Sequence, residues 1–139
     1  MFDRFSEQAR RVLFFARYEV SRWGSPHVEP EHLLLGIIRE GKGTAHELLF
    51  EKFNLDSRTL VQDLEGQLEK KPGFDTSIDI PFSTVTKEVL TATAAEADGL
   101  QHHEIGTEHL LLGILRTDSL PASVLTAHGV TLELTRQKL

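Results

Sequence analysis

The chain carries one eleven-residue pattern twice. Residues 30–40 read PEHLLLGIIRE, and residues 107–117 read TEHLLLGILRT. The two copies lie 77 residues apart, and the same offset relates Phe5-Ser6 to Phe82-Ser83. A duplication with so long a period does not fit a solenoid, which stacks many short units. We therefore predict two pseudo-symmetric halves that share one core.

Both halves show the periodicity of helices, and no stretch alternates over the length of a strand. Ser6 is the expected N-cap of the first helix and Gly24 its expected stop. The expected helices cover about residues 6–23, 30–41, 44–53, 57–70, 83–99, 107–117, 121–128 and 131–139. The segment KPGFDTSIDIP has a proline at its second and its last position and no helical periodicity, which is typical of a linker.

These patterns predict an all-α fold with one domain, residues 1–139. We expect a first repeat at 1–70, a linker at 71–81 and a second repeat at 82–139. Four helices from each repeat would form one eight-helix bundle about a pseudo-twofold axis.

The two LLLG-I segments are apolar around nearly their whole circumference, which is typical of a helix at the centre of a core. Within a helix, glycine costs about 1 kcal/mol relative to alanine. Its presence in both copies predicts that another backbone passes close by. His32 and His109 open the two helices and are predicted to point inward as hydrogen-bonded core residues. The predicted core residues are Leu34, Gly36, Ile37, Leu111, Gly113 and Ile114.

The composition excludes several classes of protein. The chain has no cysteine, so it has no disulfide, thiolate metal site or thiol nucleophile. It has 21 acidic and 15 basic residues, and the net charge of −6 argues against nucleic acid as the main partner. Its apolar runs are shorter than the roughly 20 residues of a membrane span. We expect a cytoplasmic protein whose partners are neither nucleic acids nor membranes.

Two short motifs suggest chemistry that their surroundings do not support. The G-x-x-x-x-G-K spacing that starts at Gly36 is that of a phosphate-binding P-loop, but Gly43 stands where a Ser or Thr would hold magnesium. The segment HHEIGTEH, residues 102–109, lacks the i, i+4 histidine spacing of a zinc-protease helix. We expect no cofactor, no metal and no catalytic residue. The alternatives are a structural helical domain without a ligand and a small metal-dependent hydrolase built on His102, His103, Glu108 and His109.

Glu31 and Glu108 fall in the first turn of the two central helices. On geometry alone we favour an electrostatic role, because such acids are common and complement the helix dipole by about 0.3–1 kcal/mol. The functional interpretation starts from Thr107 as the expected N-cap. Its hydroxyl and the free N–H groups of the helix start would attract an anion, and the acid beside them a cation. A ligand that carries both a guanidinium and a phosphate would suit this arrangement.

The pattern F-S-x-x-A-x-x-V-L-x-x-A near the N-terminus, a linker, and a second copy with E-H-L-L-L-G-I-[IL]-R in each half closely resemble the Clp N-terminal repeat domain. That domain stands at the front of ClpC- and ClpA-type AAA+ unfoldases. The resemblance covers essentially the whole chain. It implies a non-enzymatic eight-helix module that binds substrates and adaptor proteins for an AAA+ ring, in cis or in trans.

In ClpC-type members, the acid of each G-T-E-H motif holds the guanidinium of phosphoarginine, a mark on proteins destined for degradation. The resemblance therefore implies Glu108, Thr107 and Glu31 as site residues. The second half has the motif in full, whereas the first half reads Glu29-Pro30-Glu31-His32. Pro30 supplies neither a hydroxyl nor an N–H, and Glu29 would repel a phosphate. We expect the second half to hold the stronger site.

Overall fold

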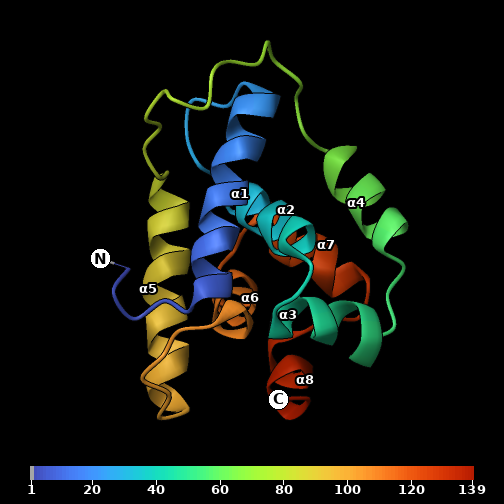
Figure 1. The fold of residues 1–139 in the computed structure, drawn as a ribbon. Coiled ribbons are helices and arrows are strands. Elements are labelled where there is room, and N and C mark those ends of the chain that lie inside the picture. Colours follow the sequence, from blue (N-terminus) through green and yellow to red (C-terminus); the bar gives the residue numbers. More distant parts are fainter. Residues whose placement is uncertain (1) are drawn as a thin grey trace.

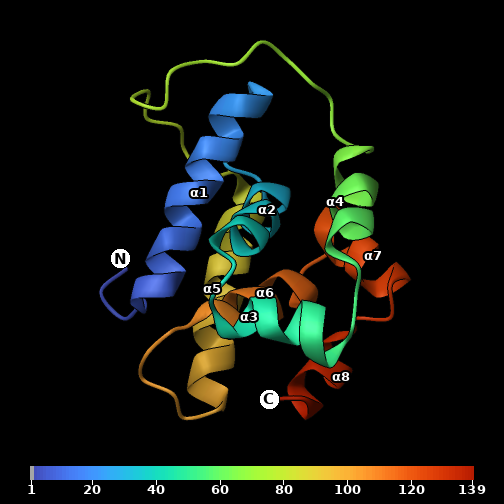
Figure 2. The ribbon, with the colours of Figure 1, turned by 45° about the vertical axis from the view of Figure 1, so that its right-hand side comes forward.

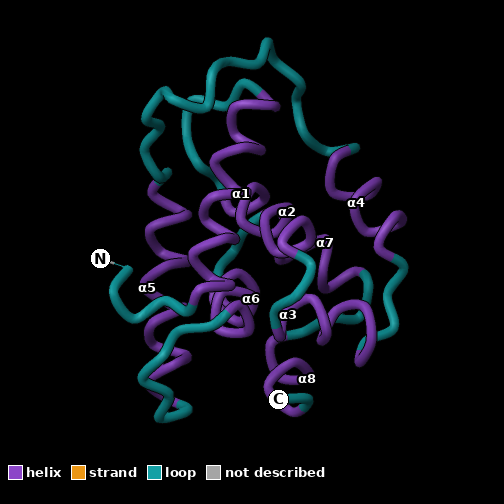
Figure 3. The backbone as a smooth tube through the Cα atoms, viewed as in Figure 1, coloured by secondary structure: helices purple, strands orange, loops and turns teal. Residues whose placement is uncertain are grey.

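The computed structural model describes residues 2–139, which contain eight α-helices and one π-helical turn (Figure 1). They are α1 (Glu7–Trp23), α2 (Pro30–Glu40), α3 (Thr44–Glu47), the π-helical turn η1 (Leu48–Lys52), α4 (Ser57–Glu65), α5 (Thr84–Gly99), α6 (Thr107–Arg116), α7 (Leu120–Ala127) and α8 (Leu132–Gln137). Helices and loops account for all of these residues in Figure 3. The predicted all-α class is confirmed, and the division at residues 70 and 82 stays a prediction.

Local caps set the ends of the longest helices, as the sequence predicts. Ser6 Oγ accepts the N–H of Ala9 at 3.1 Å at the start of α1. Its counterpart Ser83 accepts the N–H of Thr86 at 3.1 Å at the start of α5. Gly24 ends α1 in the left-handed region, with φ 68°.

The prediction that the fourth helix reaches Lys70 is wrong, because α4 ends at Glu65. Beyond that point the chain bonds to the end of α1. The N–H of Lys71 donates to the carbonyl of Trp23 at 3.1 Å, and the Lys70 ammonium donates to the carbonyl of Arg22. These hydrogen bonds to α1 hold Lys70 and Lys71 outside any helix, so that α4 does not extend to them.

The two central helices, α2 and α6, contact each other in the middle of the fold (Figure 2). Helix α2 also contacts α5 and α7 of the second repeat, and α6 contacts α1 and α3 of the first. Each of these contacts is the counterpart of another under the 77-residue offset. The predicted core residues are all buried, namely Leu34, Gly36, Ile37, Leu111, Gly113 and Ile114. This arrangement confirms the shared core and its pseudo-twofold plan.

The glycines of the central helices allow the long helices to pack closely against them. A β-carbon on Gly36 would lie 2.6 Å from the carbonyl oxygen of Val12 in α1. One on Gly113 would lie 2.8 Å from the carbonyl oxygen of Val89 in α5. The predicted close approach of a second backbone is confirmed in both repeats.

Two short backbone bridges join the repeats. Phe5 pairs with Ile105, and Phe82 pairs with Val28, so that each pair is the counterpart of the other. In the first bridge the N–H of Ser6 donates to the carbonyl of Ile105 at 2.8 Å. The start of each repeat thereby holds the loop that precedes the other repeat's central helix. Those loops lead directly into the two predicted acid sites.

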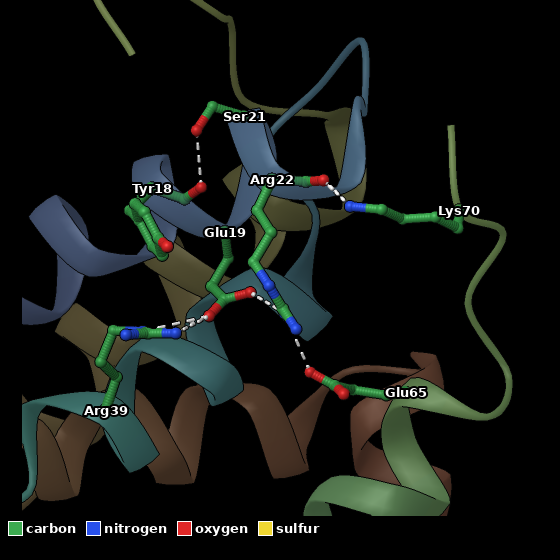
Figure 4. A network of polar contacts seen from close by, with 7 residues as sticks. All are labelled: Tyr18, Glu19, Ser21, Arg22, Arg39, Glu65 and Lys70. Carbon is green, nitrogen blue, oxygen red and sulfur yellow. Dashed lines mark hydrogen bonds and ion pairs between the residues drawn. The ribbon is translucent and has the colours of Figure 1, made fainter. Parts of the chain in front are cut away.

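A buried carboxylate in each repeat ties the long helix to the central one. Figure 4 shows Glu19 of α1 between Arg39 of α2, at 3.0 Å, and Arg22, at 3.1 Å. In the second repeat Glu96 of α5 binds Arg116 of α6 at 3.0 Å. These ion pairs are not among the features predicted from the sequence. The pattern that could have predicted them is the identity of Glu19 with Glu96 and of Arg39 with Arg116 at the 77-residue offset.

Within residues 2–139, no single helix has the length and apolar character needed to cross a membrane. Helices α6 and α7 meet that test only when taken together, and they are bent by 96° at the break between them.

Candidate functional site

The start of α6 borders a cavity of about 460 Å³ between the two repeats. The second repeat contributes the loop before α6 and the first turn of that helix. The first repeat contributes the connection between α2 and α3. The lining side chains that bear on its chemistry are Lys42, Thr44, His102, Glu104, Thr107 and Glu108.

Glu108 brings an unpaired negative charge to this cavity. Its carboxylate folds back over Gly106, where an added β-carbon would lie 3.0 Å from the carboxylate carbon of Glu108. Among residues 2–139, no Lys, Arg or His nitrogen lies within 4.0 Å of this carboxylate. The group is therefore available to a cationic ligand.

The prediction that Thr107 is the N-cap of this helix is wrong. Gly106 is the N-cap, and Thr107 is the first helical residue. The Thr107 side chain is buried, and its Oγ1 accepts the N–H of Ala45 at the start of α3, at 3.0 Å. Gly43 makes room for it, since an added β-carbon there would lie 2.8 Å from Thr107 Cγ2. The hydroxyl thus joins the two repeats instead of capping its own helix.

The first two residues of α6, Thr107 and Glu108, line the cavity. The N–H groups of Thr107 and Glu108 have no hydrogen-bond acceptor within residues 2–139, whereas His109 N–H donates to the carbonyl of Gly106 at 3.2 Å. The start of a helix also carries the positive end of its dipole. Free amides and this dipole together favour an anion.

The inward orientation predicted for the two histidines is confirmed. His32 is 3% exposed and His109 is 1% exposed. Each ring accepts, at Nδ1, the backbone N–H three residues earlier at 2.8 Å, from Glu29 and from Gly106. An accepting Nδ1 places the ring proton on Nε2 and keeps the imidazole neutral. Burial lowers the pKa of His32 to about 4 and also lowers the pKa of His109.

A second histidine completes the hydrogen bonding of His109. His109 Nε2 lies 3.0 Å from His102 Nδ1 and must donate to it, because Nδ1 of His109 is already an acceptor. Both ring nitrogens of His109 are therefore occupied. Within residues 2–139, no three His, Asp or Glu side chains are grouped so as to hold a metal ion. This geometry argues against the metal-dependent hydrolase considered from the sequence.

The counterpart site in the first repeat is different. Glu31 lines a cavity of about 170 Å³ together with Glu29 and side chains from residues 68–71, which follow α4. Glu29 is the counterpart of Gly106 at the 77-residue offset. A side chain at the Gly106 position would collide with the carboxylate of Glu108, so Glu31 beside Glu29 cannot take the conformation that Glu108 has. Burial raises the pKa of Glu31, and the charge of Glu29 acts in the same direction. The two sites match in sequence position but differ in three dimensions.

Sequence reasoning missed the part that the first repeat plays in the second site. Lys42 and Thr44 line the cavity at the start of α6, although more than 60 residues separate them from Glu108. In the sequence, Lys42 stands out only as the lysine of the rejected P-loop pattern. No local pattern could have revealed this contact, because it depends on how the two repeats pack.

Comparison with known proteins identifies the family. The profile of the Clp repeat (R) N-terminal domain matches residues 4–128. The chain belongs to this family. It is 36% identical to the negative regulator of genetic competence ClpC/MecB of Bacillus subtilis, over 100% of the chain and 17% of that protein. It is 38% identical to the chloroplastic chaperone protein ClpC1 of Oryza sativa, over 93% of the chain and 14% of that protein.

Solved structures show the same fold. The N-terminal domain of the chaperone ClpD from Arabidopsis thaliana matches with a TM-score of 0.70 and 26% identity, over 99% of this chain and 92% of that one. The Hsp104 N-terminal domain from Candida albicans matches with a TM-score of 0.77 and 16% identity, over 97% and 88% of the two chains. The resemblance inferred from the sequence is confirmed. The chain spans about one sixth of the length of the two curated relatives.

Proposed function

We propose that this Clp N-terminal domain is a non-enzymatic recognition module for a Clp AAA+ unfoldase. It would act in the cytoplasm and bind substrate proteins and adaptor proteins for an ATPase ring, in cis or in trans. The family membership supports this role, because relatives such as ClpC/MecB contain the domain as about one sixth of a longer protein.

For the cavity at the start of α6, the ligand we propose is a phosphoarginine side chain on a marked protein. The observation that carries this proposal is the unpaired carboxylate of Glu108 beside unpaired amides of the same helix start. A carboxylate binds a guanidinium through two charge-assisted hydrogen bonds, and helix amides bind a phosphate. Phosphoarginine carries these two groups next to each other.

The roles of the other two proposed site residues follow from their surroundings. Thr107 would contribute its backbone N–H to the phosphate, because its side chain is buried against the first repeat, where its hydroxyl oxygen accepts the N–H of Ala45. Glu31 would form a weaker site in the first repeat. There Pro30 offers no N–H, and the charge of Glu29 opposes a phosphate.

Titration of the isotope-labelled chain with free phosphoarginine, followed by protein NMR, tests the proposal. Shifts should centre on residues 104–109. Glu108→Ala should remove most of the binding, and the matched variant Glu31→Ala should change it little. Both variants should stay folded, since a first-turn acid contributes only about 1 kcal/mol.

Equal losses in the two variants, or shifts centred on residues 29–32, would contradict the assignment to the second repeat. A wild-type spectrum that does not change with phosphoarginine would reject this ligand.

A further inference from the structure

Lys42 belongs to the first repeat but lines the cavity at the start of α6 in the second. It lies in the connection between α2 and α3. The next residue, Gly43, packs against the side chain of Thr107 so closely that an added β-carbon would overlap it. The connection that carries Lys42 is therefore held against the first residue of α6.

Hydrogen bonds fix this connection on both sides of Lys42. Glu40 has a buried side chain, and its Oε1 accepts the N–H of Lys42 at 3.1 Å and that of Gly43 at 2.8 Å. Beyond Lys42, the N–H of Ala45 donates to Thr107 Oγ1 at 3.0 Å. The backbone at Lys42 is thus set by contacts to both repeats.

The charge of Lys42 is unpaired. Among residues 2–139, no carboxylate lies within 4.0 Å of its ammonium, whereas Arg11 on the neighbouring α1 pairs with Glu7 at 2.6 Å. Lys42 and Glu108 line the same cavity without pairing with each other. The cavity therefore presents the free cation of Lys42 from the first repeat and the free carboxylate of Glu108 from the second.

Lys42 also decides the charge balance of this cavity. It is the one Lys or Arg among the described residues of the lining, which includes two carboxylates, Glu104 and Glu108. Without Lys42 the charged side chains there would all be negative and would repel a phosphate. With it, the cavity complements a ligand that is positive at one end and negative at the other.

We propose that Lys42 is the specificity-determining residue that makes the cavity prefer phosphorylated over unmodified arginine, so that the site spans both repeats. This inference rests on the proposed function of the cavity. The counterpart of Lys42 at the 77-residue offset is Ser119, whose Oγ is buried. The first-repeat cavity does not include Ser119 in its described lining. The cation of the first-repeat cavity is Lys71, which follows α4 of the same repeat and shares the lining with three carboxylates, Glu29, Glu31 and Glu69.

The test compares the affinities of free phosphoarginine and free arginine for the 139-residue chain by calorimetry and NMR. Lys42→Gln should weaken phosphoarginine about tenfold, the loss expected for one charge-assisted contact, and Lys42→Glu should weaken it further. Arginine should bind both variants at least as well as the wild type, because the cation near Glu108 is gone. Lys87→Gln, an exposed lysine outside this cavity, is the control and should leave both affinities unchanged.

The possible results separate this inference from the function on which it rests. If the wild type binds phosphoarginine and Lys42→Gln binds it within twofold as well, the inference is overturned and the proposed function stands. If Lys42→Gln weakens arginine and phosphoarginine equally, Lys42 shapes the cavity and does not select the phosphate. If the wild type binds no phosphoarginine, the proposed function fails, and the inference fails with it.

Discussion

Acidification should destabilise this fold through His32. The imidazole is 3% exposed, and its Nδ1 accepts the N–H of Glu29 at 2.8 Å. A proton on that nitrogen would remove the acceptor and place a charge in the core. Burial lowers the pKa of His32 to about 4, against 6.5 for an ordinary histidine. The folded state therefore favours the neutral ring, so its stability contribution is complete above pH 6.5 and is lost as the pH falls toward 4.

The size of the effect follows from this difference in pKa. A difference of about 2.5 pH units corresponds to about 3 kcal/mol in full. Between pH 7 and pH 4.5, about 2 kcal/mol of that should be lost. At pH 5.5 the unfolding reaction should take up about 0.9 proton at this residue, because the unfolded ring is mostly protonated and the folded ring hardly at all.

Urea denaturation at pH 7 and at pH 4.5 measures the loss. His32→Gln should be less stable than the wild type at pH 7 but should lose about 2 kcal/mol less between the two pH values. His103→Gln, at an exposed position, is the control and should follow the wild type. His109 is present in all three proteins, so its own lowered pKa contributes equally to each. An equal loss in His32→Gln and the wild type would refute the reasoning.

Three further substitutions test the packing. Leu111→Ala, in a fully buried position, should lower the free energy of unfolding by about 2–5 kcal/mol, and a loss below about 1 kcal/mol in urea denaturation would show that α6 is not central. Gly36→Ala should destabilise the fold despite the better helix propensity of alanine, because the added β-carbon would lie 2.6 Å from a carbonyl oxygen of α1. The control is Gly99→Ala, where the space is open, and its thermal unfolding should show no such loss. Glu96→Gln should cost about 1–3 kcal/mol by weakening its bonds to two arginines, and a cost no larger than that of the exposed Glu88→Gln would contradict this role.

The sequence alone predicted the architecture because its signals are local or duplicated. Helical periodicity and the caps at Ser6 and Gly24 act within a few residues, and they placed the long helices correctly. The two apolar LLLG-I segments identified the central helices, and the glycine in each indicated a backbone in close contact. The duplication also indicated that the helices of one repeat have counterparts in the other. The family followed from the same two motifs and their separation.

The candidate site could be predicted only in part. The position of Glu108 in a first helical turn is a local property. A difference between the two acid sites was also predictable, because Glu29 and Pro30 replace Gly106 and Thr107. The hydrogen bond of the Thr107 hydroxyl is not a local property. The structure directs it to an amide of α3 in the other repeat.

Tertiary structure alone decided which residues share the cavity. Lys42 meets the start of α6 because Gly43 leaves space against it, and His102 meets His109 because the loop before α6 folds back onto that helix. The end of α4 is set in the same way, by hydrogen bonds between the following segment and α1. Periodicity and capping describe interactions within about one helical turn. Contacts across tens of residues form only when the repeats pack, because packing brings these side chains and amides together.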